Sequence, residues 1–89
     1  MEVKYHPLVA KLDIPKLDKS IKERIRNVIE EKLSIKPELY GIPLRYDLRN
    51  LRKVRAGNYR IVFMLKDNLI FIIAIAHRKE VYKIITRRI

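Results

Sequence analysis

Basic side chains are concentrated around a segment that reads Leu-Arg-Lys-Val-Arg-Ala-Gly-Asn-Tyr-Arg-Ile-Val-Phe over residues 51–63. The cations of this region are Arg45, Arg49, Arg52, Lys53, Arg55 and Arg60, and Asp47 is the only acid among residues 45–60. Crowded Lys and Arg side chains bind phosphate groups well, because they supply both charge and hydrogen-bond donors. We therefore expect an anionic ligand, and a phosphodiester in particular, to bind across this segment.

These residue types also allow chemistry on RNA. Cleavage by the RNA's own 2′-hydroxyl group needs a base that takes the hydroxyl proton, cations that stabilise the crowded phosphate, and an acid for the 5′-oxygen. Arginine holds its proton too tightly to be the base, whereas lysine can serve when neighbouring positive charges favour its neutral form. Lys53 is therefore the candidate base, and Arg55 and Arg60 are candidates for stabilising the phosphate.

A second polar cluster follows an apolar segment that ends at Ala76, and it consists of His77, Arg78, Lys79 and Tyr82. His77 or Arg78 would lie near the leaving oxygen, and Tyr82 could stack on a base or hold the 2′-hydroxyl group. Taken alone, the residue types favour binding of RNA or of an acidic protein over catalysis.

Two strand patterns position the first cluster. They flank a turn at Gly57 and Asn58, which both tolerate positive φ. Val54 and the alternating Tyr59-Ile61-Phe63 supply a buried face on this hairpin.

A third strand, Leu69 to Ala76, follows a second tight turn over residues 66–68. Its alternate positions are Ile70, Ile72 and Ala74 on one side and Phe71, Ile73 and Ile75 on the other. Because both sides are apolar, we expect the strand to lie centrally, with helices on one face and a second chain or a cleft on the other. Antiparallel pairing with the preceding strand would bring His77 and Arg78 within a side chain's reach of Arg60.

The other expected elements are a strand over Glu2 to His6, a short helix over Pro7 to Leu12 that ends before Pro15, a helix over Asp18 to Ser34, a loop over Pro37 to Pro43 and a short C-terminal helix. The long helix has one apolar stripe, and Asp18 is a good N-cap. These patterns predict an α+β fold, with an antiparallel sheet of about four strands packed by N-terminal helices.

Length and charge limit the possible classes of protein. The chain has 89 residues, which predicts one domain over residues 1–89. It has 21 Lys and Arg against 10 Asp and Glu, a formal net charge of +11, and such an excess usually serves an anionic partner. Cysteine is absent and no apolar run reaches the roughly 20 residues of a spanning helix, so we expect a cytoplasmic protein with no membrane partner.

Two segments, Arg-Ala-Gly-Asn-Tyr-Arg-Ile-Val and His-Arg-Lys-Glu-Val-Tyr, together with the order of elements, resemble the RelE/ParE superfamily of toxins, and the RelE branch most. The resemblance covers nearly the whole chain. It implies a toxin that enters the ribosomal A site and cuts the messenger RNA there, without a metal or other cofactor. It also implies a RelB-like antitoxin as the partner that neutralises the toxin.

Position by position, the resemblance assigns the catalytic roles to Lys53, Arg60, Arg78 and Tyr82. It leaves Arg45, Arg49, Arg52, Arg55, His77 and Lys79 as RNA-binding candidates. The segment between the last strand and Glu-Val-Tyr is shorter than in the best-known bacterial member, so Lys79 is an alternative to Arg78. Two other functions stay open: a ParE-like toxin that poisons DNA gyrase, and an inactive basic RNA-binding module.

Overall fold

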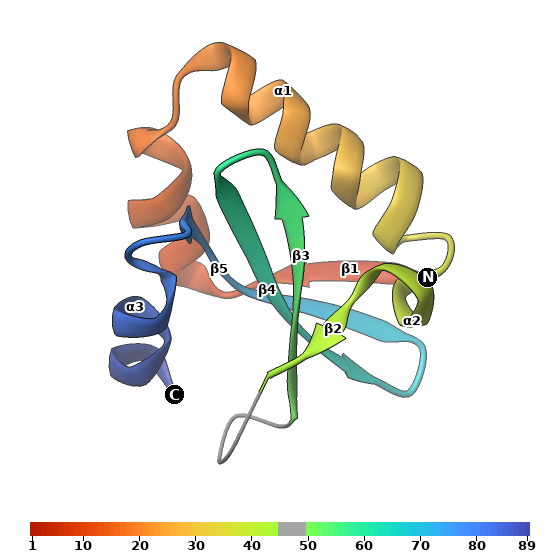
Figure 1. The fold of residues 1–89 in the computed structure, drawn as a ribbon. Helices are drawn as coiled ribbons and strands as arrows, with labels where there is room; N and C mark the ends of the chain where they lie inside the picture. Colours follow the sequence, from red (N-terminus) through yellow and green to blue (C-terminus); the bar gives the residue numbers. More distant parts are fainter. Residues whose placement is uncertain (45–49) are drawn as a thin grey trace.

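The computed structural model describes residues 1–44 and 50–89, except for the side chains of residues 39 and 40. Its centre is a five-stranded sheet with the strand order β1-β5-β4-β3-β2 (Figure 1). The strands are β1 (Glu2–Tyr5), β2 (Ile42–Pro43), β3 (Leu51–Ala56), β4 (Tyr59–Lys66) and β5 (Leu69–His77). All neighbours are antiparallel except β1 and β5, which are parallel.

The α+β class is therefore confirmed, with a mixed sheet of five strands where the sequence predicts an antiparallel sheet of about four. The difference has two sources. The first strand pairs with β5 at one edge of the sheet and not with a sequence neighbour, so its direction could not be read from a hairpin. The two residues of β2 are too few to give a periodic signal.

Helical segments flank the sheet. They are η1 (Val9–Asp13), η2 (Ile14–Lys16), α1 (Lys19–Val28), η3 (Ile29–Leu33), α2 (Pro37–Tyr40) and α3 (Val81–Arg88). The segment η3 continues α1 directly, so the predicted helix from Asp18 to Ser34 is confirmed. The carboxylate of Asp18 accepts a hydrogen bond from the amide of Ile21 at 2.9 Å. This bond and one from the Ser20 hydroxyl lower the pKa of Asp18 below its ordinary value.

The short first helix extends further than predicted. It continues through Asp13, and η2 then includes Pro15 in its first turn. A proline there loses no intrahelical hydrogen bond, so Pro15 does not end the helical path.

The predicted loop from Pro37 to Pro43 is also more ordered than expected. Pro37 opens the one-turn helix α2, and Ile42–Pro43 pairs with β3. Between them, Gly41 packs so closely on the ring of Phe63 that an added Cβ would lie 2.4 Å from it. Arg52 stabilises the position of Gly41, because its Nη1 donates a hydrogen bond to the Gly41 carbonyl oxygen at 2.9 Å.

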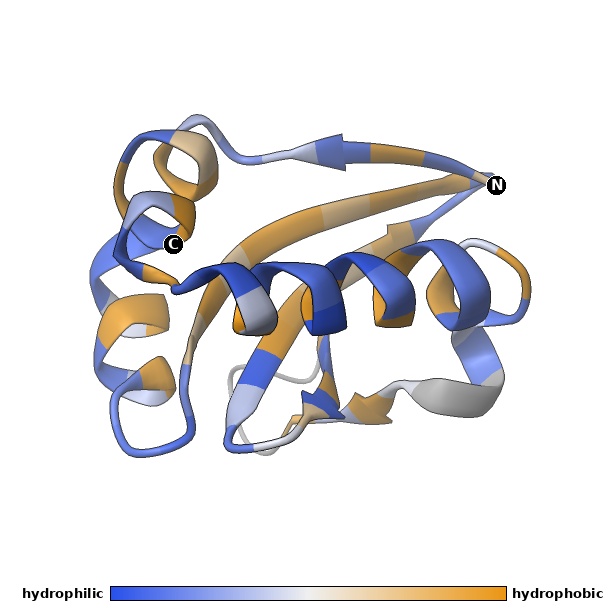
Figure 2. Cartoon of the chain, turned by 90° about the horizontal axis from the view of Figure 1, so that it is seen from above, coloured by the Kyte–Doolittle hydropathy of each residue, from blue (hydrophilic) through white to orange (hydrophobic). Residues whose placement is uncertain are grey.

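Two apolar clusters cover the two faces of the sheet. The first joins α1, η1 and η3 to one face and includes Ile25, Leu33, Ile61 and Phe63. Figure 2 shows α1 crossing this face with hydrophobic positions turned to the strands. The second cluster packs Val81 and Ile85 of α3 against Val62 and Ala74. The chain's own C-terminal helix therefore covers part of the face that the sequence left to a partner or a cleft.

The predicted alternation along β5 is correct only in its first half. Ile70, Ile72 and Ile75 belong to the α1-side cluster, whereas Phe71, Ile73, Ala74 and Ala76 belong to the α3-side cluster. The register shifts between Val62 and Phe63, which pair with Ala74 and Ile72, so Ile73 is an extra residue in β5. Such a bulge reverses the facing of the residues that follow it.

Candidate functional site

The central contact of the candidate site joins β3 to α3. Lys53 points to the α3 side of the sheet, and its Nζ donates a hydrogen bond to the hydroxyl oxygen of Tyr82 at 2.7 Å. The same Nζ lies 5.3 Å from the centroid of the Tyr82 ring. Tyr82 is nevertheless 46% exposed and Lys53 is half-buried, so the contact between them is open to a ligand. Two residues that are far apart in sequence thus form one polar unit.

Arg55 and Arg60 stand directly opposite each other on β3 and β4, and both share the sheet face with Lys53. The Nη1 atom of Arg60 donates to the carbonyl oxygens of Gly57 and Tyr59 at 3.0 and 2.9 Å. Burial, then the charge of Arg55, lowers the pKa of Arg60 from its ordinary value. Like charges opposite each other destabilise a sheet, and an anion between them would remove that cost.

Arg78 approaches the same place from the end of β5. Its backbone N–H donates to the carbonyl oxygen of Asn58 at 2.8 Å, which ties the segment after β5 to the turn of the β3–β4 hairpin. The charge of Arg78 also contributes to lowering the pKa of Arg60. The predicted approach of Arg78 to Arg60 is therefore confirmed.

A hollow of about 560 Å³ lies between α1 and the tip of the hairpin. We call it the basic hollow, and it is lined by Arg24, Val28, Lys32, Arg55, Ala56, Gly57, Asn58, Arg60 and Arg78. A neighbouring hollow of about 520 Å³, the Lys53 hollow, is lined by Ile42, Lys53, Val54, Arg55 and Arg60. Because Arg55 and Arg60 line both, the two hollows adjoin.

His77 lies elsewhere, contrary to the expectation that it would reach Arg60. It pairs with Tyr59 across the strands, and the two rings meet edge to face with centroids 5.5 Å apart. Tyr59 and His77 line a separate hollow with Asp13 and Glu80. The reason is alternation: His77 follows Ala76, which faces α3, so its own side chain turns to the other face.

The other RNA-binding candidates are dispersed. Arg52 points to the α1 side and binds the Gly41 carbonyl, so it supports the fold. Lys79 is exposed in the turn before α3, and its backbone N–H donates to Nδ1 of His77 at 3.2 Å. Arg45 and Arg49 lie outside the described residues.

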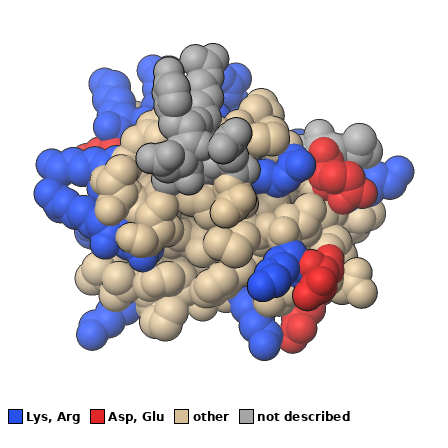
Figure 3. Space-filling model, turned by 90° about the horizontal axis from the view of Figure 1, so that it is seen from below, with Lys and Arg blue, Asp and Glu red and all other residues tan. Residues whose placement is uncertain are grey.

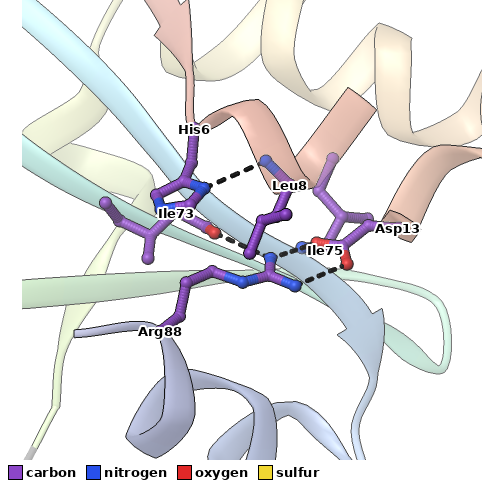
Figure 4. A network of polar contacts seen from close by, with 6 residues as sticks. All are labelled: His6, Leu8, Asp13, Ile73, Ile75 and Arg88. Carbon is purple, nitrogen blue, oxygen red and sulfur yellow. Dashed lines mark hydrogen bonds and ion pairs between the residues drawn. The ribbon is translucent and has the colours of Figure 1, made fainter. Parts of the chain in front are cut away.

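Sequence reasoning missed a buried ion pair that fixes α3. Arg88 donates from Nη1 to Oδ2 of Asp13 at 2.7 Å and from Nη2 to Oδ1 at 3.0 Å (Figure 4). The side chains are 6% and 3% exposed. The pair also binds the backbone at the β5 bulge. Arg88 Nη1 donates to the carbonyl oxygen of Ile73, and the N–H of Ile75 donates to Oδ2 of Asp13.

Sequence reasoning missed Arg24 as well. Arg24 is an exposed residue of α1, and only the crossing of α1 over the hairpin turn brings it into the basic hollow. No periodicity or motif carries that information. For Asp13, the one available signal is an acid inside a short helix that is otherwise apolar on one side.

Charge is unevenly distributed on the surface. Figure 3 shows Lys and Arg side chains gathered at the left of the face drawn, with an uncharged centre beside them. Within the described residues, no helix is long and apolar enough to cross a membrane. The described part of the chain also contains no group of three His, Cys, Asp or Glu side chains that would hold a metal ion.

Residues 3–82 match the family described as ParE toxin of type II toxin–antitoxin system, parDE. Since this match covers most of the chain, the fold and the sequence agree on the class. The chain belongs to the RelE/ParE superfamily of toxins from type II toxin–antitoxin systems. A comparison with curated proteins gives no match.

Solved structures of this superfamily share the fold. The RelBE2 toxin–antitoxin complex of Mycobacterium tuberculosis contains a chain that is 26% identical, with a TM-score of 0.79, over 86% of this chain and 96% of that one. The RelB–RelE complex of Methanococcus jannaschii contains a chain that is 26% identical, with a TM-score of 0.68, over 90% of this chain and 95% of that one. The isolated RelE toxin of E. coli is 22% identical with a TM-score of 0.70, and the match covers 98% of this chain and 96% of that one. A YoeB/ParE toxin of Agrobacterium tumefaciens is 15% identical with a TM-score of 0.71, and the match covers 88% of this chain and 99% of that one.

Proposed function

We propose that this toxin is a cytoplasmic, single-domain endoribonuclease that cuts messenger RNA in the ribosomal A site without a metal ion. The observation that carries this proposal is the polar unit of Lys53 and Tyr82 beside Arg55, Arg60 and Arg78 on one side of the sheet. A base candidate, a hydroxyl group and several cations are what cleavage through the 2′-hydroxyl group needs.

In the proposed reaction, Lys53 takes the proton of the 2′-hydroxyl group, and the 2′-oxygen attacks the adjacent phosphorus. The bond to the 5′-oxygen breaks and that oxygen takes a proton from solvent, which leaves a cyclic 2′,3′-phosphate on one product and a 5′-hydroxyl end on the other. Arg60 and Arg78 stabilise the charge that builds up on the phosphate. The hydroxyl group of Tyr82 accepts from Lys53, so it keeps its own proton for donation to an RNA oxygen.

We propose that a RelB-like antitoxin neutralises the toxin. The RelBE2 complex of Mycobacterium tuberculosis and the RelB–RelE complex of Methanococcus jannaschii are both toxin–antitoxin complexes. Each contains a chain with the fold of this toxin. The formal charge of +11 favours an acidic partner.

The alternative is a ParE-like toxin that acts on DNA gyrase, and the match to the ParE family over residues 3–82 favours it. This function shares the fold and gives no role to the Lys53–Tyr82 contact. That contact is the reason to prefer cleavage of RNA. A basic module that binds RNA without cutting it is the remaining alternative.

Primer extension on a messenger in a translating extract separates these functions. Cuts within codons that occupy the A site, absent without ribosomes, are the expected result. DNA breaks in a gyrase reaction with intact messenger would support the ParE-like function instead. Intact messenger and intact DNA would favour the inactive module.

A further inference from the structure

The wall of the basic hollow that α1 supplies has no role in the proposed cleavage. We propose that the basic hollow binds a second backbone phosphate of a single-stranded RNA, next to the bond that is cut, and that Arg24 is a phosphate-binding residue. Only the position beside the cut bond rests on the proposed function. Binding of the RNA backbone itself does not depend on cleavage.

Arg24 is held against the hairpin turn by shape. A Cβ added at Gly57 would lie 3.1 Å from Nη1 and 3.2 Å from Cζ of Arg24, so the guanidinium group packs on the bare backbone of the turn. Gly57 has a φ of +64°, which already favours glycine. The glycine therefore shapes the turn and also leaves the space in which Arg24 packs on it.

The arginines of this hollow face no acidic side chain among its described lining residues. Its cationic lining comes from three separate parts of the chain: Arg24 of α1 and Lys32 of the continuing segment η3, Arg55 and Arg60 from the hairpin, and Arg78 from the segment after β5. The guanidinium groups of Arg24, Arg55 and Arg78 make no hydrogen bond within the described part of the chain. A concave, uncompensated set of guanidinium groups fits a phosphate, which accepts several charge-assisted hydrogen bonds at once.

The neighbouring hollow indicates which phosphate this is. The basic hollow and the Lys53 hollow share Arg55 and Arg60, so a strand whose reacting phosphate lies beside Lys53 continues over these arginines toward Arg24. The lining also argues for RNA over an acidic protein. Among the described residues that line the basic hollow, only Val28 and Ala56 have apolar side chains, and a protein partner would need more apolar surface to bury.

Binding of a single-stranded RNA that cannot be cut tests this proposal directly. We suggest fluorescence anisotropy with a labelled 2′-O-methyl oligonucleotide of about 10 nucleotides, a length in the usual range for such sites. We expect Arg24→Ala to weaken binding roughly 5- to 10-fold at low salt. The slope of log Kd against log salt should fall by about 0.7, the value for one lost phosphate contact to a single strand.

Arg26→Ala is the matched control. Arg26 is exposed on the same helix, carries the same charge and lines a different, more apolar hollow with Tyr5. We expect it to leave both the affinity and the salt slope nearly unchanged. Arg24→Lys should keep the slope and lose part of the affinity, because it keeps the charge without the planar fork.

Three results would overturn the proposal. Equal losses in Arg24→Ala and Arg26→Ala would mean that only overall charge matters. Unchanged RNA binding in Arg24→Ala would remove the site. Weaker binding of a polyglutamate peptide with unchanged RNA binding would make the hollow a protein surface.

Cleavage in a translating extract, measured beside the binding assay, keeps the two proposals apart. If the unaltered toxin cuts no messenger but Arg24→Ala still weakens binding of the oligonucleotide, the proposed function fails and the phosphate site stands. If the toxin cuts and the Arg24 and Arg26 variants cut and bind alike, the phosphate site fails alone.

Discussion

At the scale of single residues, the proposed reaction assigns stabilisation of the phosphate to Arg60, which lines the Lys53 hollow, and to Arg78, which lines the adjoining basic hollow. We expect Arg60→Ala and Arg78→Ala each to lower cleavage of the messenger on the order of 10²-fold, because each removes one charge contact to the transition state. Primer extension in a translating extract gives the rates. Lys66→Ala is the control, since Lys66 is an exposed cation at the far end of the same strand as Arg60.

Arg60 also holds the carbonyl oxygens of Gly57 and Tyr59, so its loss could act through the turn. Thermal unfolding of the Arg60 variant separates the two effects. A loss of cleavage with an unchanged Tm supports the charge contact. If none of the variants at Lys53, Arg60, Arg78 and Tyr82 changes cleavage, the active site lies elsewhere.

The hydrogen bond between Lys53 and Tyr82 predicts that the two residues act as a unit. We expect Tyr82→Phe to lower cleavage about 10-fold or more, which is the cost of a lost hydrogen bond to a charged group. Adding Tyr82→Phe to Lys53→Ala should have little further effect, because the partner is already gone. Rates of the two single variants and the double variant form the test. Losses that multiply would mean that the two side chains act independently, and full activity of Tyr82→Phe would point to stacking of the ring on a base.

At the scale of elements, the position of α3 depends on the pair of Asp13 and Arg88. Asp13→Ala would leave the Arg88 charge and the N–H of Ile75 buried without their partner. We expect it to lower the free energy of unfolding by about 3–5 kcal/mol, the usual cost of breaking one half of a buried pair. Urea unfolding measures this, and Glu23→Ala, which changes an exposed acid of α1, is the control.

Replacing both partners by apolar residues tells a charge effect from a packing effect. Asp13→Leu with Arg88→Met should recover much of the lost stability, because no charge is then left buried. Cleavage should fall in Asp13→Ala and stay low in the double variant if the ion pair also sets where α3 holds Tyr82. Stability and cleavage that recover together would show that any well-packed contact places α3 adequately.

Local patterns in the sequence predicted most elements correctly, and the errors have a common cause. The long helix, the hairpin and β5 each follow from periodicity and turn residues within one segment. The parallel pairing of β1, the bulge at Ile73 and the side of the sheet that His77 faces all depend on contacts between distant segments. The bulge is the clearest case, because its freed backbone groups bind Asp13 and Arg88, which lie 75 residues apart.

The same distinction holds for the site. Residue type made Lys53 and Arg60 candidates, and antiparallel pairing predicted that Arg78 would approach Arg60, whereas the full set with Tyr82 came from the family resemblance. Arg24 could not be named, since its place depends on how α1 crosses the hairpin turn. Sequence patterns therefore reach the residues on the sheet, and the helix packing adds the rest.

At the scale of the whole molecule, a formal charge of +11 on 89 residues raises the free energy of the isolated chain through self-repulsion. The fold does not disperse this charge, because Arg55 and Arg60 face each other across two strands. An anionic partner would relieve the repulsion. A chain of this kind is expected to associate with nucleic acid and with an acidic protein by the same surface.

The last prediction concerns how an antitoxin meets this surface. We expect the association rate with an acidic RelB-like antitoxin to fall with added salt more steeply than the dissociation rate changes, because long-range attraction mainly accelerates the encounter. Since α3 already covers part of the second sheet face, apolar burial there offers the partner less than a bare sheet would. Stopped-flow association at low and high salt gives the rates, and the variant with Arg55→Ala and Arg78→Ala should show a weaker dependence than the variant with Lys66→Ala and Lys36→Ala. Association that is equally fast at all salt concentrations would mean that apolar contacts alone guide the antitoxin, and that the basic surface serves RNA only.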